Sequence, residues 1–167
     1  MEAPRLQKQL ALDTNLLLDL AEGADFAHEF REVFQARGYG FLAPPTVLAE
    51  LHEQSANGAT ARKRELARIA LGKILEWDVS PLHLSGVQTA IAERLGSRFL
   101  ELRLLPESEG NDALILAETA LANVALLVTS DKHLLDMDED ALALAFSDAD
   151  LQPAHPVHPK ALLRAIR

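Results

Sequence analysis

Hydrophobic residues follow two different patterns along this chain. Short apolar runs that end at polar residues, such as 9–13 and 124–129, are typical of strands buried in a sheet. Longer segments between them repeat apolar residues every three or four positions, as on one face of a helix. We therefore expect strands over 9–13, within 38–45, and over 76–80, 124–129 and 142–146. The expected helices cover 15–20, 26–37, 46–54, 59–75, 85–95, 111–123, 131–136 and 159–166.

This order, in which strands are separated by helices, predicts an α/β fold: a central parallel β-sheet flanked by helices on both faces. In such folds ligands bind at the carboxyl ends of the strands. A length of 167 residues suits one domain, which can bury roughly 70% of the surface of the unfolded chain. Because the sequence has no repeat, low-complexity tract or obvious linker, we expect a single domain over 1–167.

Composition narrows the class and the location of the protein. The chain is 49% hydrophobic and 25% charged, which is typical of a globular protein. It has no cysteine, which excludes disulfides, thiolate zinc sites and a cysteine nucleophile and fits a reducing compartment. The longest apolar run, Ala141–Phe146, is too short to span a membrane, and residues 1–9 lack the apolar stretch of a signal peptide. We expect a cytoplasmic protein without a membrane partner.

The net charge works against a nucleic-acid partner over most of the surface. It is −9, from 25 acidic residues and 16 lysines and arginines, whereas binding to nucleic acid depends on neutralising phosphates. The segment 55–75 departs from this balance, with five basic residues and one acid. Its helix could contact phosphates, present an ordinary solvated face, or pack against a second copy or another protein. The candidate RNA-binding residues are Arg62, Lys63, Arg64 and Arg68.

Acidic residues stand close to the ends of the predicted strands. Asp13 ends the first strand, Asp131 follows the strand at 124–129, and Asp112 lies in the first turn of the preceding helix. Glu50 borders the apolar face of the helix after the second strand. Carboxylates that converge at one edge of a sheet repel each other by about 4 kcal/mol per close pair. Divalent cations relieve this repulsion, and oxygen-only ligands favour Mg²⁺ or Mn²⁺.

Each of these acids also has an ordinary structural explanation. Asp13 and Asp131 are well placed to cap the helices that follow them. Asp112 in a first helical turn is favoured by the helix dipole, and Glu50 could be a solvated helix residue. These alternatives stay open for each residue, whereas the joint pattern is harder to explain without a ligand.

Four segments of the sequence resemble the motifs of PIN-domain proteins, whose best-known members are the VapC-like ribonuclease toxins of bacterial toxin–antitoxin pairs. The resemblance extends from Gln9 to the terminal helix. The chain also lacks a Walker loop, a Rossmann glycine fingerprint and a Gly-x-Ser-x-Gly elbow. The four segments are Leu12-Asp13-Thr14-Asn15, Pro44-Pro45-Thr46-Val47-Leu48-Ala49-Glu50-Leu51, Asn111-Asp112-Ala113-Leu114-Ile115-Leu116-Ala117 and Val128-Thr129-Ser130-Asp131-Lys132-His133-Leu134-Leu135.

The resemblance implies a PIN-like fold with a metal site formed by these acids. Asp13 and Asp112 would be the principal ligands of Mg²⁺ or Mn²⁺. Asp131 would complete the site or hold a metal-bound water, and Glu50 would orient water or bind a second ion. The polar side chains expected to support the carboxylates by hydrogen bonds are Asn15 and Thr129.

The implied function is a metal-dependent endoribonuclease, in which water activated by Mg²⁺ or Mn²⁺ hydrolyses RNA phosphodiester bonds. The implied partners are RNA and an antitoxin protein, and a homodimer is a further expectation. The acidic segment Asp136–Asp140 is expected to be a solvated loop or an edge that faces the antitoxin. The alternative is a non-catalytic PIN-like module that binds RNA or protein and uses its acids as helix caps. Acids at all four motif positions favour the nuclease.

Overall fold

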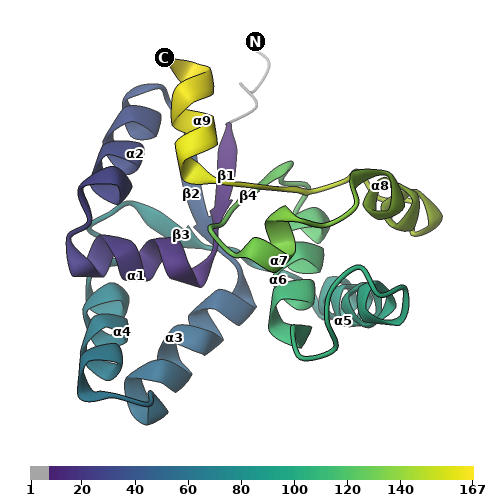
Figure 1. Ribbon diagram of the computed structural model, residues 1–167, viewed down its shortest axis with the longest axis horizontal. Helices are drawn as coiled ribbons and strands as arrows, with labels where there is room; N and C mark the ends of the chain where they lie inside the picture. The colour runs from purple at the N-terminus through teal and green to yellow at the C-terminus, as the bar shows by residue number, and fades with distance from the viewer. Residues whose placement is uncertain (1–7) are drawn as a thin grey trace.

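The computed structural model describes residues 8–167, and its centre is a five-stranded sheet in which all neighbouring strands are parallel (Figure 1). The predicted α/β fold is therefore confirmed. The strands, in their order across the sheet, are β3 (Val79–Pro81), β2 (Gly40–Ala43), β1 (Gln9–Leu12), β4 (Leu126–Val128) and β5 (His155–Val157).

Helices cover the sheet on both sides. In Figure 1, the first two helices lie on one side of β1, and the fifth and sixth lie on the other. Three successive residues of β1, Leu10–Leu12, are all buried, as expected for a strand that is covered on both faces. The helices are α1 (Thr14–Glu22), α2 (Asp25–Ala36), α3 (Pro45–Asn57), α4 (Ala61–Lys73), α5 (Gly86–Glu101), α6 (Gly110–Leu121), α7 (Lys132–Leu135), α8 (Glu139–Asp148) and α9 (Pro159–Ile166).

Contacts between aromatic rings stabilise the packing of the helices against the sheet and against each other. The rings of Phe30 and Phe34 on α2 lie 4.6 Å apart between centroids, and Phe30 lies 6.2 Å from Phe41 on β2. On the other side, Phe99 of α5 meets Phe146 of α8 edge to face at 5.3 Å. Such pairs add about 0.5–1.5 kcal/mol each to the free energy gained by burying the rings.

Helices α5 and α6 approach each other closely at Gly96. A Cβ atom at this position would lie 3.3 Å from both the Cα and the N atom of Leu114 on α6. Because a backbone cannot move aside as a side chain can, only glycine fits this contact without a shift of one helix. Gly96 therefore sets the distance between α5 and the helix that carries Asp112.

The two edge strands of the sheet each contain a proline. In β5, His155 and Val157 bond to β4, so the residue between them, Pro156, faces the open side. In β3, the outward positions are Pro81 and Val79, and the N–H of Val79 donates to the carbonyl of Ile74. Neither edge strand thus presents a free outward N–H group along its length.

The prediction of a strand at 142–146 is wrong. This segment belongs to α8, whose first turn is capped by Asp138, the acceptor of the Ala141 N–H at 2.8 Å. Leu142, Ala145 and Phe146 are buried on one helical face. The fifth strand is instead β5, which lies among prolines and is only three residues long.

Several predicted helices have different ends in the structure, by one to six residues. Helix α5 continues past the expected end at residue 95 to Glu101, through Gly96 and Ser97. Helix α4 is shorter than the predicted 59–75. Within residues 8–167, no helix combines the length and the apolar character that crossing a membrane requires.

Candidate active site

Asp13 lies directly after β1, in the middle of the sheet, and caps the N-terminus of α1. Its side chain is only 3% exposed. One carboxylate oxygen accepts the N–H of Thr14 and the other accepts the hydroxyl of Thr129, each at 2.7 Å. Burial raises the pKa of Asp13 to about 6, although both hydrogen bonds oppose that rise. The site thus holds a buried carboxylate in a fixed orientation.

Thr129 connects the segments that carry Asp13 and Asp131. It is fully buried at the end of β4, donates its hydroxyl to Asp13, and accepts the N–H of Asp131 at 3.0 Å. Asp131 in turn caps α7 by accepting the N–H of Leu134 at 3.1 Å. Asn15 accepts the N–H of Ser130 at 3.4 Å. Thr129 therefore has a hydrogen bond to a site carboxylate, whereas the bond of Asn15 goes to the backbone beside Asp131.

Asp112 lies in the first turn of α6, where it meets two other carboxylates. Glu109, Asp112 and Asp131 each offer an oxygen atom, and these three atoms lie within 4.8 Å of one another. Burial raises the pKa of Asp112 to about 9, together with a hydrogen bond to Glu109 and the charges of Asp13 and Asp131. A metal-free site therefore retains a proton near neutral pH on the pair formed by Asp112 and Glu109.

Glu109 is the site residue that the sequence analysis missed. It is the N-cap residue of α6, three positions before Asp112, so that both carboxylates lie at the same end of the helix. Its carboxylate also lies 3.8 Å from the ring of His133. The spacing of three residues between the two acids could have indicated this role. Glu109 lies before the segment 111–117 that resembles a PIN-domain motif, however, and no helix was predicted at its position.

Glu50 reaches the site from α3 and is half-buried. It accepts the hydroxyl of Thr14 at 2.6 Å and a hydrogen bond from the side chain of Asn111. Burial raises its pKa. Because the N–H of Thr14 also donates to Asp13, this single residue links both carboxylates.

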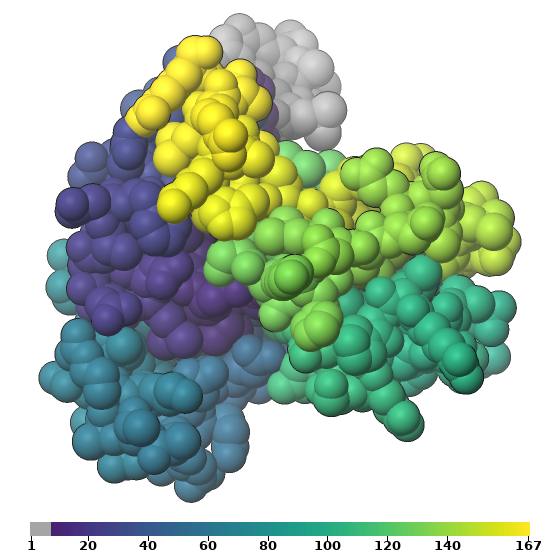
Figure 2. Space-filling view, viewed as in Figure 1, coloured from purple at the N-terminus to yellow at the C-terminus, as the bar shows by residue number. Residues whose placement is uncertain are grey.

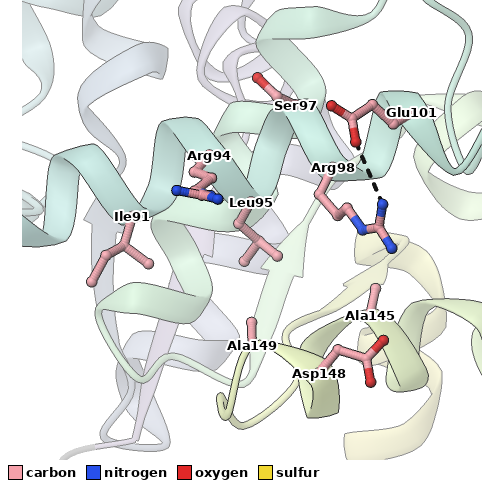
Figure 3. A pocket seen from close by; sticks show the side chains of 9 residues that line it. All are labelled: Ile91, Arg94, Leu95, Ser97, Arg98, Glu101, Ala145, Asp148 and Ala149. Atoms are coloured by element: carbon pink, nitrogen blue, oxygen red, sulfur yellow. Dashed lines mark hydrogen bonds and ion pairs between the residues drawn. The ribbon is translucent and has the colours of Figure 1, made fainter.

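Two hollows in the surface differ in their relation to the acidic site. The first, of about 470 Å³, lies beside Glu50 between α3 and the start of α6. The second, of about 720 Å³, lies between α5 and α8, where Figure 3 shows Arg98 paired with Glu101 at 3.5 Å and no group of converging carboxylates. The lining of the first hollow is Thr46, Ala49, Glu50, Glu53, Gln54 and Asn111.

The four predicted acids thus form one connected region. Asp112 and Asp131 belong to the close group, Asp13 is tied to Asp131 through Thr129, and Glu50 is tied to Asp13 through Thr14. In Figure 2, the surfaces of α1, α3 and α7 meet near the middle of the visible face. The structural explanation holds as well, because Asp13 and Asp131 do cap helices. The two roles are compatible.

The basic residues of α4 lie apart from this region. Two of them have local partners: Arg62 pairs with Glu65 at 3.5 Å, and Arg64 donates to the carbonyl of Gly58 at 2.7 Å. Lys63 and Arg68 are exposed. Among residues 8–167, none of the four forms a hydrogen bond or ion pair with a carboxylate of the site, so RNA binding by α4 stays a prediction.

The donor set suits a hard divalent cation. Glu109, Asp112 and Asp131 offer only oxygen atoms, spaced closely enough to share one ion. Neither cysteine nor a cluster of histidines accompanies them among the described residues, so the chemistry favours Mg²⁺ or Mn²⁺ over zinc.

A parallel sheet with carboxylates gathered at the ends of its central strands defines an α/β protein with an acidic ligand site. The PIN domain model matches residues 10–140, which include all four predicted acids. The chain belongs to the PIN domain family, and the predicted resemblance is confirmed. A comparison with proteins of curated function gives no match.

Three solved structures share this fold. One is VapBC2 from Rickettsia felis bound to a DNA fragment from their promoter, with 18% identity, a TM-score of 0.62, and coverage of 90% of this chain and 98% of that chain. Another is VapBC-1 from nontypeable Haemophilus influenzae, with 15% identity, a TM-score of 0.56, and coverage of 91% and 98%. The third is FitAcB from Neisseria gonorrhoeae, with 15% identity, a TM-score of 0.53, and coverage of 90% and 97%. At these identities the likeness is one of fold.

Proposed function

We propose that this PIN domain is a Mg²⁺- or Mn²⁺-dependent endoribonuclease that hydrolyses RNA phosphodiester bonds. The observation that carries the proposal is the approach of Glu109, Asp112 and Asp131 to within 4.8 Å of one another, next to the buried Asp13. Carboxylates at such distances cannot all be ionised unless a cation neutralises them. Burial raises the pKa of Asp112, and the neighbouring carboxylates raise it further.

Asp13, Asp112 and Asp131 would hold the metal, with Glu50 lining the same site and Glu109 adding a fifth carboxylate. A bound ion would act as a Lewis acid toward a phosphoryl oxygen and would lower the pKa of water. Thr14 and Thr129 keep Asp13 oriented through their hydrogen bonds. Glu50, held by the hydroxyl of Thr14, would orient the attacking water or bind a second ion.

We further propose that the protein acts in the cytoplasm as the toxin of a toxin–antitoxin pair, as one domain over residues 1–167 that binds an antitoxin and forms a homodimer. Support for the antitoxin comes from the three structural neighbours, which are structures of VapBC2, VapBC-1 and FitAcB. The acidic segment Asp136–Asp140 remains the proposed antitoxin-facing edge; Asp136, Asp138, Glu139 and Asp140 in it are exposed.

Cleavage of a mixed RNA substrate tests the activity. The wild-type protein should cut RNA with Mn²⁺ or Mg²⁺ and lose that activity in excess EDTA. The variants Asp13→Asn and Asp112→Asn should fold but not cut, whereas Asp148→Asn, which changes an exposed acid on α8, should cut normally. Equal cleavage with and without EDTA, or normal cleavage by Asp112→Asn, would contradict the proposal.

The second candidate is a PIN-like module that binds RNA or protein without cutting it. The observation that favours it is that Asp13 and Asp131 have complete structural roles as helix caps without any ion. In that case the wild-type protein would retain RNA or a protein partner in a binding assay and leave RNA intact with either metal.

A further inference from the structure

Glu118 is a buried carboxylate that the proposed metal site does not use. It lies on α6, six residues after Asp112, and is only 4% exposed. One of its oxygens accepts the backbone N–H of Thr46 at 3.0 Å, and the other accepts the hydroxyl of Thr46 at 2.9 Å. Both oxygens are thus committed to one residue of a different helix.

Helix α3 needs this contact because of how it begins. Its N-cap residue is Pro44, which offers no side-chain acceptor, and Pro45 follows as the first helical residue. The first N–H groups of a helix have no partner within the helix and are stabilised by a negative charge nearby. Glu118 supplies from α6 the acceptor and the charge that a serine or aspartate usually supplies at the N-cap.

The same contact fixes the position of Glu50. Thr46 and Glu50 are four residues apart on α3, so their side chains lie on the same face, one turn apart. Both line the hollow beside Asn111, which itself donates to Glu50 from the first turn of α6. Helix α6 therefore contacts α3 at two positions, Thr46 and Glu50. The same helix carries Asp112.

We propose that Glu118 is a positioning residue of the metal site, which caps α3 from across the helix interface and thereby holds Glu50 beside the other carboxylates. This inference rests on the proposed metal-dependent function. A purely structural role would stabilise the fold equally well but would leave the metal affinity of the folded protein unchanged. Metal affinity and stability therefore have to be measured on the same variants.

Two substitutions at position 118 separate geometry from charge. Glu118→Leu removes both hydrogen bonds to Thr46. Glu118→Gln retains them without the charge, because its amide oxygen accepts the N–H and its amide nitrogen donates to the hydroxyl oxygen. The matched control is Thr119→Val, since Thr119 is buried on the same helix and its hydroxyl bond to Ile115 stays within α6.

The experiment measures Mn²⁺ affinity by calorimetry, unfolding free energy in urea, and amide hydrogen exchange over 46–54, which begins after the two prolines. Taking Glu50 in its proposed role as a residue that binds an ion, we expect Glu118→Leu to weaken Mn²⁺ binding roughly 10- to 100-fold, the usual cost of losing a group that orients a metal ligand. Exchange at the start of α3 should become faster. Glu118→Gln and Thr119→Val should bind Mn²⁺ like wild type, and Glu118→Leu should have no further effect in a Glu50→Gln background.

Three outcomes would overturn the inference. Glu118→Leu that is less stable but binds Mn²⁺ normally would show a purely structural role, with the proposed function intact. If Glu118→Leu fails to fold, Thr46→Val, which removes only the hydroxyl bond, must weaken Mn²⁺ binding in the same direction, and normal binding would count against the inference. Wild-type protein that binds no Mn²⁺ would contradict the proposed function, and the positioning role with it.

Discussion

At the scale of single residues, threonine hydroxyls organise the site. Thr129 donates to Asp13 and accepts the N–H of Asp131, while Thr14 donates its N–H to Asp13 and its hydroxyl to Glu50. Each threonine thus restrains two acidic segments that would otherwise repel each other. The acidic segments of the site are thus held together by neutral donors.

Replacing Thr129 by valine tests this organisation. The change preserves shape but removes the donor from a carboxylate that is 3% exposed, so the free energy of unfolding should fall by about 1–3 kcal/mol at pH 8. The loss should shrink at acidic pH, where Asp13 is protonated. Urea unfolding checks both. The control is Thr89→Val at an exposed position of α5, which should change the free energy of unfolding by less than about 0.5 kcal/mol.

The pKa of Asp112 makes the stability of the metal-free protein depend on pH. Its folded-state pKa is raised from 3.8 to about 9, so the folded state binds the proton more tightly than the unfolded state. Stability due to this proton is complete below about pH 4 and is lost as the pH rises toward 9. Unfolding in EDTA should therefore become easier over this interval, and Asp112→Asn should flatten the dependence. An equal slope in the variant would refute this assignment.

Some residues of the site could be predicted from the sequence, and others could not. The positions of Asp13, Asp112 and Asp131 followed from strand and helix ends, which meet at one edge of a parallel sheet. Glu109 and Glu118 could not be assigned in this way. The role of Glu109 depends on the unpredicted start of α6, and that of Glu118 on a contact with α3 that arises only from helix packing.

At the scale of elements, prediction succeeded for long segments with a strong hydrophobic periodicity and failed for short segments. The eight predicted helices and the strands around Asp13 and Asp131 are present, with shifts of a few residues at their ends, but α8 was not predicted as a helix. Segment 142–146 alternates between alanine and larger apolar residues, which imitates a strand, but the cap at Asp138 begins a helix there. Strand β5 has three residues and a central proline, too little for any pattern.

The contact between α5 and α6 gives a prediction at this scale. Gly96→Ala gains up to about 1 kcal/mol in helix propensity but should lose about 1–3 kcal/mol by forcing the helices apart. Gly72→Ala is the matched control, because a Cβ at Gly72 on α4 meets nothing within 4 Å. Thermal or urea unfolding should show Gly72→Ala more stable than wild type and Gly96→Ala less stable. A stabilised Gly96→Ala would contradict the close approach.

At the scale of the whole molecule, the net charge of −9 repels RNA, so that binding has to depend on local contacts. Substitution of Arg62, Lys63 and Arg68 by alanine tests the basic face of α4, leaving Arg64 to hold Gly58. If these residues neutralise three phosphates, the slope of log affinity against log salt should flatten by roughly 2 for single-stranded RNA. Mn²⁺ affinity should not change.

The same variant also tests whether α4 is an interface between two copies of the protein. An unchanged salt slope with a changed oligomeric state, measured by analytical ultracentrifugation on the same variant, would show that α4 packs against a second copy. The RNA-binding assignment of this helix would then be withdrawn.

The prolines at the two edges of the sheet limit how the protein can assemble. A chain that joins a sheet as an additional strand needs a row of outward donors, and neither β3 nor β5 provides one along its length. Backbone pairing at the margins of the sheet is therefore disfavoured as a way for a partner to bind. The same arrangement keeps folded copies of this protein from pairing edge to edge and forming fibrillar aggregates at high concentration.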